Sequence, residues 1–288
     1  MSYRKILVSV QAGNGARSAL DSAFALAKEF GAHVEGLRAR GTDGSGSYVG
    51  EGMSGALVQE LVELTEQESA QRAPRARCSK KGVMLPVIPD ADSPGTGGPS
   101  ASWLEEMGRE ADAVVLAGRL ADLIVVGRTG NEVHGSAPVL TAALFETGRP
   151  VLVAGKRAEG QNPTDRAGAP RWVVVAWNQS AEAARAVAGA LPLLARAQRV
   201  TAVSVGDGDE TARGLADLAR YLAWHGINAE TAVLSGHPSP SEALAAAGAG
   251  ADLVVLGGYS HSRLRELILG GVTRHLLEKT SLPLLLAH

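Results

Sequence analysis

Two segments of this chain are closely similar, and this repetition constrains the fold more than any other feature. ADLIVVGR at 121–128 recurs as ADLVVLGG at 251–258, and each is followed by a Pro-led apolar run. A repeat of this length in a chain of 288 residues predicts a tandem duplication. Two further pairs of apolar runs correspond: 149–155 with 282–288, and 4–10 with 171–177.

In the second copy, continuous apolar runs alternate with segments of helical period, which is typical of a parallel sheet covered on both faces. We predict Ser180 as the N-cap of the first helix, and Ser239 with Glu242 as a capping box for the third. The predicted strands are 172–177, 200–205, 228–234, 252–257 and 283–287. The predicted helices are 180–197, 209–225, 239–248 and 271–280.

The first copy follows the same plan but is longer in the middle. The predicted strands are 4–10, 33–39, 101–106, 122–127 and 150–154. The Gly-, Pro- and Ser-rich segments 41–55 and 86–100 are predicted as loops on either side of a helix at 56–74. The expected fold class is α/β, with two tandem doubly wound five-stranded parallel-sheet domains at 1–155 and 171–288, joined by a linker at 156–170.

Composition narrows the range of partners. The formal net charge is -2 and aromatic residues make up only 4% of the chain, so we expect no nucleic-acid partner. No apolar stretch approaches the length of a membrane span, and the N-terminus lacks the pattern of a signal peptide, so we expect no membrane partner. Cys78 is the only cysteine, which excludes an intrachain disulfide and favours a cytoplasmic location.

The stretch GGYSHSRLRELILGGVTRHLL at 257–277 is the main candidate for a site. It leaves the carboxyl end of a predicted strand, where open α/β sheets bind ligands. The backbone amides of Gly271, Val272 and Thr273 would open the following helix, and such amides favour anions. A phosphate-binding loop and a strand-to-helix connection without a ligand are both compatible with these residues.

The other motifs give weaker indications of a functional site. GEGMSG at 50–55 matches a dinucleotide-binding pattern, but it does not directly follow a strand, so we interpret it as a loop. Ser260 and His261 adjoin without a carboxylate placed to orient the imidazole, so no catalytic residue is predicted. The histidines lack metal-ligand spacing, so no metal site is predicted either. Asp122 and Asp252 precede corresponding strands, opposite the ligand edge, and we interpret both as structural.

With these residues in this order, the chain resembles tandem members of the universal stress protein family. The family has an α/β fold of the adenine nucleotide alpha hydrolase type. Its nucleotide-binding members carry G-x2-G-x9-G-[S/T] after the fourth strand, and Gly257, Ser260, Gly270 and Gly271 fall on those four positions. Ser260 replaces the second glycine and Gly271 replaces the hydroxyl residue, while Val272-Thr273 matches the usual continuation.

The resemblance implies further contacts. Asn178 falls where the family has an adenosine-binding aspartate, Val205 matches a residue on the adenine side, and the first strand contributes Ala176. In the first copy the equivalents are Gln11, Gly127 and Gly130, but the G-[S/T] step is missing, so we expect no triphosphate there. The implied nucleotide-binding set is Ala176, Asn178, Val205, Gly257, Ser260, Gly270, Gly271, Val272 and Thr273.

The function implied by the resemblance is a regulatory role in stress response, with adenine nucleotide (AMP or ATP) bound by the second copy and Mg²⁺ required only with ATP. A nucleotide-free interaction scaffold and a slow nucleotide hydrolase are the alternatives. The fifth strands of the family meet antiparallel across a dimer. We therefore expect either a homodimer or an intrachain pseudo-dimer, because PVLVA and PLLLA would be exposed apolar edges.

Overall fold

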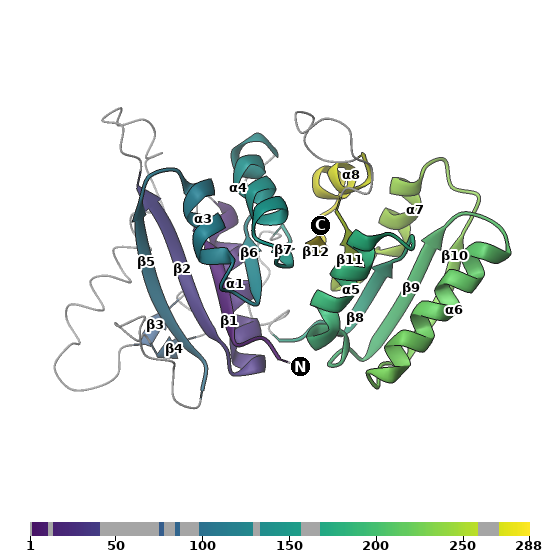
Figure 1. Cartoon of the computed structure of the whole chain (residues 1–288), viewed down its shortest axis with the longest axis horizontal. Coiled ribbons are helices and arrows are strands. Elements are labelled where there is room, and N and C mark those ends of the chain that lie inside the picture. Colours follow the sequence, from purple (N-terminus) through teal and green to yellow (C-terminus); the bar gives the residue numbers. More distant parts are fainter. Residues whose placement is uncertain are drawn as a thin grey trace. The chain divides into compact units, whose positions relative to one another are not determined.

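The structure of the chain is a computed structural model whose contacts divide it into two compact units (Figure 1). The N-terminal unit contains residues 2–149, and the C-terminal unit contains residues 150–155 and 169–288. The described residues are 2–10, 14–40, 75–77, 84–86, 98–128, 133–156, 168–258 and 271–288. In these ranges, no helix is both long and apolar enough to cross a membrane.

The C-terminal unit has the predicted alternation of strands and helices, and its strands lie in the order β10-β9-β8-β11-β12-β7. The strands are β7 (Val151–Val153), β8 (Trp172–Ala176), β9 (Arg199–Val205), β10 (Ala229–Leu234), β11 (Leu253–Gly257) and β12 (Leu284–Ala287). The helices are α5 (Ala181–Leu194), α6 (Asp209–Trp224), α7 (Pro240–Ala247) and α8 (Gly271–Lys279). All neighbouring strands run parallel except β12 and β7.

Burial explains why β8 and β11 are central. Val173–Val175 are 0% exposed, and Leu253–Leu256 are at most 4% exposed, as expected for parallel strands covered on both faces. Each fully buried side chain of this size contributes about 1.5–3 kcal/mol relative to an exposed one. The continuous apolar runs of β8 and β11 therefore account for their central position in the sheet.

Two predicted helix caps are present. The Ser180 hydroxyl accepts a hydrogen bond from the amide of Ala183 at 3.1 Å, and the Ser239 hydroxyl accepts one from the amide of Glu242 at 3.2 Å. Each hydroxyl satisfies an amide that has no partner within its own helix. The start of α5 and the start of α7 are therefore decided locally, by the residue that precedes each helix.

The N-terminal unit repeats the plan, with its strands in the order β6-β1-β2-β5, all parallel. The strands of this sheet are β1 (Lys5–Ser9), β2 (His33–Arg40), β5 (Ser100–Met107) and β6 (Leu123–Val126). The helices are α1 (Asn14–Phe30), α3 (Glu110–Gly118) and α4 (Val133–Glu146). This order and that of the C-terminal unit confirm the predicted fold class.

The long middle of the first copy contains a small sheet that the sequence analysis missed. Strands β3 (Arg75–Arg77) and β4 (Met84–Pro86) pair antiparallel. The predicted loop 86–100 is wrong at both ends, because Pro86 closes β4 and Ser100 opens β5. The predicted loop 41–55 and helix 56–74 lie outside the described residues.

Strand β7 ends the first copy in sequence but packs in the C-terminal unit. It runs antiparallel to β12, with Val153 opposite Leu284 and Val151 opposite Leu286. These are the two apolar edge strands expected to need cover, and here they cover each other within one chain. The division into domains at residues 155 and 171 stays a prediction.

One carboxylate in each copy clamps the start of the central strand. Asp122 Oδ2 accepts from the amides of Arg4 (2.7 Å) and Lys5 (3.0 Å). In the second copy, Asp252 Oδ2 accepts from the backbone amides of Arg171 and Trp172, both at 3.0 Å. The two aspartates thus hold β1 and β8 in register with their neighbours, which agrees with the structural interpretation.

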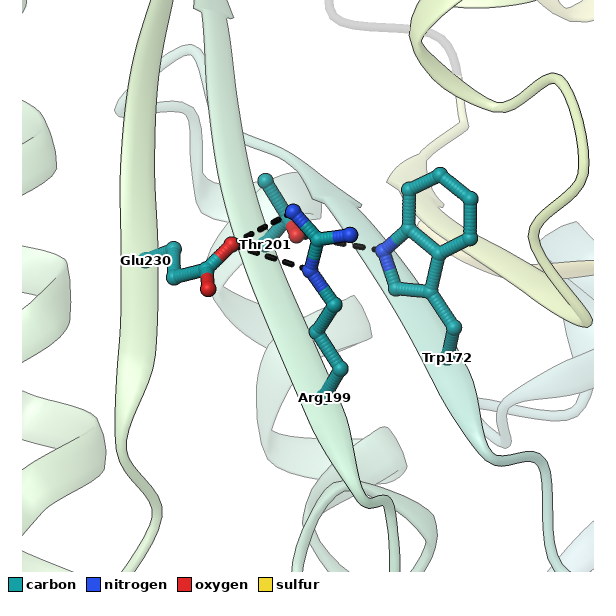
Figure 2. A network of polar contacts seen from close by, with 4 residues as sticks. All are labelled: Trp172, Arg199, Thr201 and Glu230. Atoms are coloured by element: carbon teal, nitrogen blue, oxygen red, sulfur yellow. Dashed lines mark hydrogen bonds and ion pairs between the residues drawn. The ribbon is translucent and has the colours of Figure 1, made fainter.

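On one face of the C-terminal sheet, polar side chains link β8, β9 and β10 near their amino ends (Figure 2). The Arg199 guanidinium donates to Glu230 Oε2 from Nε (2.9 Å) and Nη2 (2.7 Å), and it lies 4.9 Å from the Trp172 ring centre. The indole of Trp172 donates to the Thr201 hydroxyl at 3.1 Å. Because the Arg199 and Glu230 side chains are more than half exposed, their ion pair contributes at most about 1 kcal/mol to stability.

The corresponding strands of the N-terminal unit carry a more buried polar cluster. His33 contacts the Ser100 hydroxyl through Nδ1 and the Ser102 hydroxyl through Nε2, both at 2.8 Å. Glu35 is 5% exposed and pairs with Lys5 at 3.0 Å. By register, Lys5 stands next to His33 as Trp172 stands next to Arg199. The corresponding strands of the two copies therefore carry different polar side chains.

Replacing Asp252 with alanine should lower the free energy of unfolding by about 1–3 kcal/mol, because two backbone amides lose a charged acceptor. Urea denaturation of the full chain measures this. Asp217→Ala is the control, because Asp217 forms only an exposed ion pair with Arg220, and its effect should stay within about 0.5 kcal/mol. Equal effects of the two substitutions would contradict the clamp.

The buried cluster should make stability depend on pH. Burial lowers the pKa of His33, with Glu35 opposing and Lys5 adding to this shift. The folded state therefore favours the neutral imidazole. Its contribution is complete above the ordinary histidine pKa of about 6.5 and is lost as the pH falls through the lowered folded value.

We expect His33→Gln to flatten the fall in unfolding free energy between about pH 7.5 and pH 5, while His225→Gln, at an exposed position, leaves it unchanged. Denaturation curves at several pH values give this slope. Identical slopes in the wild type and the His33 variant would contradict the assignment.

Candidate functional site

The strand order of the C-terminal unit reverses direction between β8 and β11. From β8 the chain moves outward to β9 and β10, and it then returns to β11 on the other side. Val173–Val175 pair directly with Leu253–Val255, so both strands end at one edge. In open α/β sheets, ligands bind at such a reversal, beyond the carboxyl ends of the strands.

Gly257, the last residue of β11, lets α5 approach this edge closely. A Cβ at this position would lie 2.5 Å from the backbone nitrogen of Ala183, in the first turn of α5. The N-terminal unit repeats the arrangement, since a Cβ on Gly127 would lie 2.2 Å from the carbonyl oxygen of Gly15 in α1. A side chain would displace the helix in both copies, which explains the repeated glycine.

Asn178 lies just beyond the end of β8 and is exposed. Its Oδ1 accepts from the amide of Ser180 at 3.2 Å, and the intervening Gln179 has a left-handed φ of 59°. Because the chain itself occupies Oδ1, the amide Nδ2 is the donor that Asn178 can offer to a ligand. The aspartate of related sites could offer no such donor.

Ala176 and Val205 end β8 and β9, and both are half-buried. Trp177 lies between Ala176 and Asn178, and its amide donates to the carbonyl of Val203 at 2.8 Å. The indole Nε1 of Trp177 is buried and has no hydrogen-bond partner among the described residues. Two apolar side chains and an unsatisfied donor therefore lie at the ends of β8 and β9.

Glu182, which the sequence analysis missed, sits in the first turn of α5. A backbone hydrogen bond at the start of the helix lowers its pKa, and the Ser180 hydroxyl and the nearby His288 lower it further. The carboxylate therefore neutralises this helix end. His288 contacts the carbonyl of Gly258 at 3.1 Å on the same edge. The N-terminus of α5 is thus already supplied with an anion.

The N-terminus of α8 has a different environment. Gly271 is exposed, and a Cβ on it would meet no atom of the described residues within 4 Å. Val272 is half-buried, and Thr273 is only 2% exposed, so its side chain belongs to the packing of α8. Ser260 and Gly270 lie outside the described residues. Convergence of the amides at 271–273 on an anion pocket stays a prediction.

The edge of the N-terminal unit differs at the position that follows Gly127. Arg128 replaces the Gly258 of the second copy and is only 8% exposed, and burial lowers its pKa to about 10. On β1, the Ser9 hydroxyl donates to a carboxylate oxygen of Glu110. Gln11 and Gly130 lie outside the described residues. The expectation that this copy holds no triphosphate stays a prediction.

Most of the other residues considered for a site lie outside the described ranges. These include Ser260 with His261, and the glycine-rich segment 50–55. Within the described ranges, no group of three or more His, Cys, Asp or Glu side chains could hold a metal ion. The structure therefore brings together Ala176, Asn178, Val205 and Gly257, with Gly271 opening the helix that follows β11.

Two repeated α/β units, each with a reversal of its strand order, define a tandem protein of the doubly wound class. The sequence model of the universal stress protein family matches residues 2–139 and 171–288. The chain belongs to the universal stress protein family. This membership confirms the resemblance seen in the repeated motifs, and the two matched segments confirm the tandem duplication.

Similarity to individual proteins is modest. A universal stress protein of Synechocystis sp. (strain ATCC 27184 / PCC 6803 / Kazusa) is 31% identical over 86 residues, which are 29% of this chain and 30% of that relative. The match thus spans less than a third of the relative's length.

Solved structures share the fold along the whole chain. A universal stress protein from Archaeoglobus fulgidus DSM 4304 has a TM-score of 0.67 at 15% identity, covering 98% of this chain and 97% of that one. A Pseudomonas aeruginosa UCBPP-PA14 protein assigned to the same family has a TM-score of 0.56 at 16% identity, covering 99% and 93%. A universal stress protein solved with cAMP covers 42% of this chain and 98% of its own, at 22% identity and a TM-score of 0.37.

Replacing Gly257 with alanine should push α5 away from the end of β11 and lower the free energy of unfolding by about 1–3 kcal/mol. Gly271→Ala is the matched control, because its Cβ would meet no atom of the described part of the chain within 4 Å, and its effect should stay within about 0.5 kcal/mol. Urea denaturation compares the two. If both variants match the wild type, the close approach of α5 to Gly257 is wrong.

Proposed function

We propose that this protein is a cytoplasmic regulatory protein of the stress response whose C-terminal unit binds an adenine nucleotide. The ligand is AMP or ATP, with Mg²⁺ accompanying ATP. The observation that carries the proposal is the contrast between two helix ends in one unit. The start of α5 carries the ionised Glu182, whereas the start of α8 presents an exposed glycine on which a Cβ would meet no atom of the described residues within 4 Å.

The adenosine moiety would bind at the ends of β8 and β9. Ala176 and Val205 offer half-buried apolar surface of the kind that packs against a base. Asn178 can donate from Nδ2 to a ring nitrogen or a ribose oxygen.

The phosphates would bind at the start of α8. The amides of Gly271, Val272 and Thr273 open this helix, and its dipole favours an anion there. Gly257 starts the connection to α8, and by family resemblance Ser260 and Gly270 complete the phosphate contacts. Because Gly271 lacks a hydroxyl, one charged hydrogen bond is missing, which weakens binding by about 1.5–3 kcal/mol.

Antiparallel pairing of β7 with β12 supports an intrachain pseudo-dimer as the arrangement of the fifth strands. The strands that would otherwise form an interchain dimer are already paired in one chain. A nucleotide-free scaffold is the alternative function, and it becomes the conclusion if the ligand experiments below fail.

Gly271→Ser should tighten nucleotide binding about tenfold or more, because the hydroxyl restores the missing hydrogen bond to a phosphate. Gly271→Asp should abolish binding, because its carboxylate takes the place of the ligand anion. Because a Cβ on Gly271 would meet no atom of the described residues within 4 Å, both variants should stay folded. Isothermal titration calorimetry of the full chain with AMP, ATP with Mg²⁺, and cAMP measures the three affinities.

Adenosine is the matched control ligand, because it lacks a phosphate and should bind the two variants equally. No heat and no thermal shift with any nucleotide at millimolar concentration, in both the wild type and Gly271→Ser, would remove the proposal. Equal nucleotide affinities of the serine and aspartate variants would remove the assignment of phosphate to α8.

A further inference from the structure

The outer edge of β10 presents unpaired backbone groups. Among the described residues, no strand pairs with this edge, and β9 occupies the other one. The carbonyl of Leu234 accepts from Gly206, so Leu234 points its backbone groups toward β9. Because successive residues of a strand alternate in direction, Thr231 and Val233 point their N–H and C=O groups outward.

This edge lacks the features that normally protect a free strand. Its sequence, AETAVL, contains no lysine and no proline. Its single charge, on Glu230, is neutralised by the two hydrogen bonds from Arg199 (Figure 2). In contrast, the last strand of the N-terminal unit, β5, carries exposed carboxylates at Glu105 and Glu106. The β10 edge is thus uncharged and suited to pairing.

We propose that the β10 edge pairs antiparallel with β10 of a second copy of this chain. In an antiparallel pairing, residues whose backbone groups point outward form the hydrogen-bonded pairs. Thr231 of each chain can therefore lie opposite Val233 of the partner subunit. Two such pairs exchange four backbone hydrogen bonds. Ala232 then lies on the two-fold axis and faces its own counterpart.

The side chains favour this register and a second copy as the occupant. Thr231 is exposed and Val233 is 39% exposed, and pairing them places one β-branched residue against another. Glu230 falls opposite Leu234 of the partner subunit, so no like charges meet. Because both chains use the same edge, one association covers the β10 edge of each chain.

A pair of charge variants tests the contact. Thr231→Lys with Val233→Lys places lysine opposite lysine twice, at Cβ separations of about 4.5–5.5 Å, and should convert the dimer to a monomer. Thr231→Glu with Val233→Lys places opposite charges across the same two pairs and should restore the dimer. Analytical ultracentrifugation of the full chain measures the mass of each, and circular dichroism checks that each is folded.

Cross-linking tests the register. In a Cys78→Ser background, Ala232→Cys should form an interchain disulfide on mild oxidation, because the two Cα atoms would lie about 4.5 Å apart. Thr231→Cys is the control. In this variant the two cysteines of the dimer would be diagonal neighbours about 7–8 Å apart, so a disulfide should form much less readily.

A monomeric wild type at micromolar concentration would overturn the proposal, and it would point instead to an extended segment of another protein as the occupant. A dimer that survives the double lysine substitution would overturn it as well. Cross-linking through residue 231 rather than 232 would overturn the register.

Discussion

Burial of the central strands on both faces is the constraint on which the C-terminal unit depends. Val173–Val175 and Leu253–Leu256 leave no room for a solvated face, so helices must cover both sides of the sheet. Helices on both sides require the strand order to reverse, and the reversal falls between β8 and β11. The place where a ligand can bind is thus a consequence of how the core is closed.

The two copies share this frame and differ in what they build on it. Asp122 and Asp252 make equivalent clamps, and Gly127 and Gly257 allow equivalent helices to approach a strand end. The residue after each glycine differs, a buried arginine in the first copy and Gly258 in the second. Duplication has therefore kept the contacts that close the sheet, while the ligand edges have diverged.

Much of the fold could be predicted, because its signals are local. Ser180 caps α5 and Ser239 caps α7 as expected, since a hydroxyl next to the first helical turn acts within three residues. Strands β3 and β4 were missed because three-residue strands are too short to show a period. Glu182 was also missed, although its pKa is lowered mainly by hydrogen bonds at the start of its own helix, and only the effect of His288 comes from a distant segment of the chain.

The sequence by itself determined the duplication, the α/β class and the carboxyl-edge positions of Asn178, Val205 and Gly257, because apolar runs that alternate with helical segments predict parallel strands whose carboxyl ends share one edge. Only the tertiary structure decided that β7 packs against β12, that His288 lies near Glu182, and that Arg199 neutralises Glu230 on the edge strand β10. Each of these depends on which distant segments become neighbours. That information lies in the packing of the chain and not in any local stretch of it.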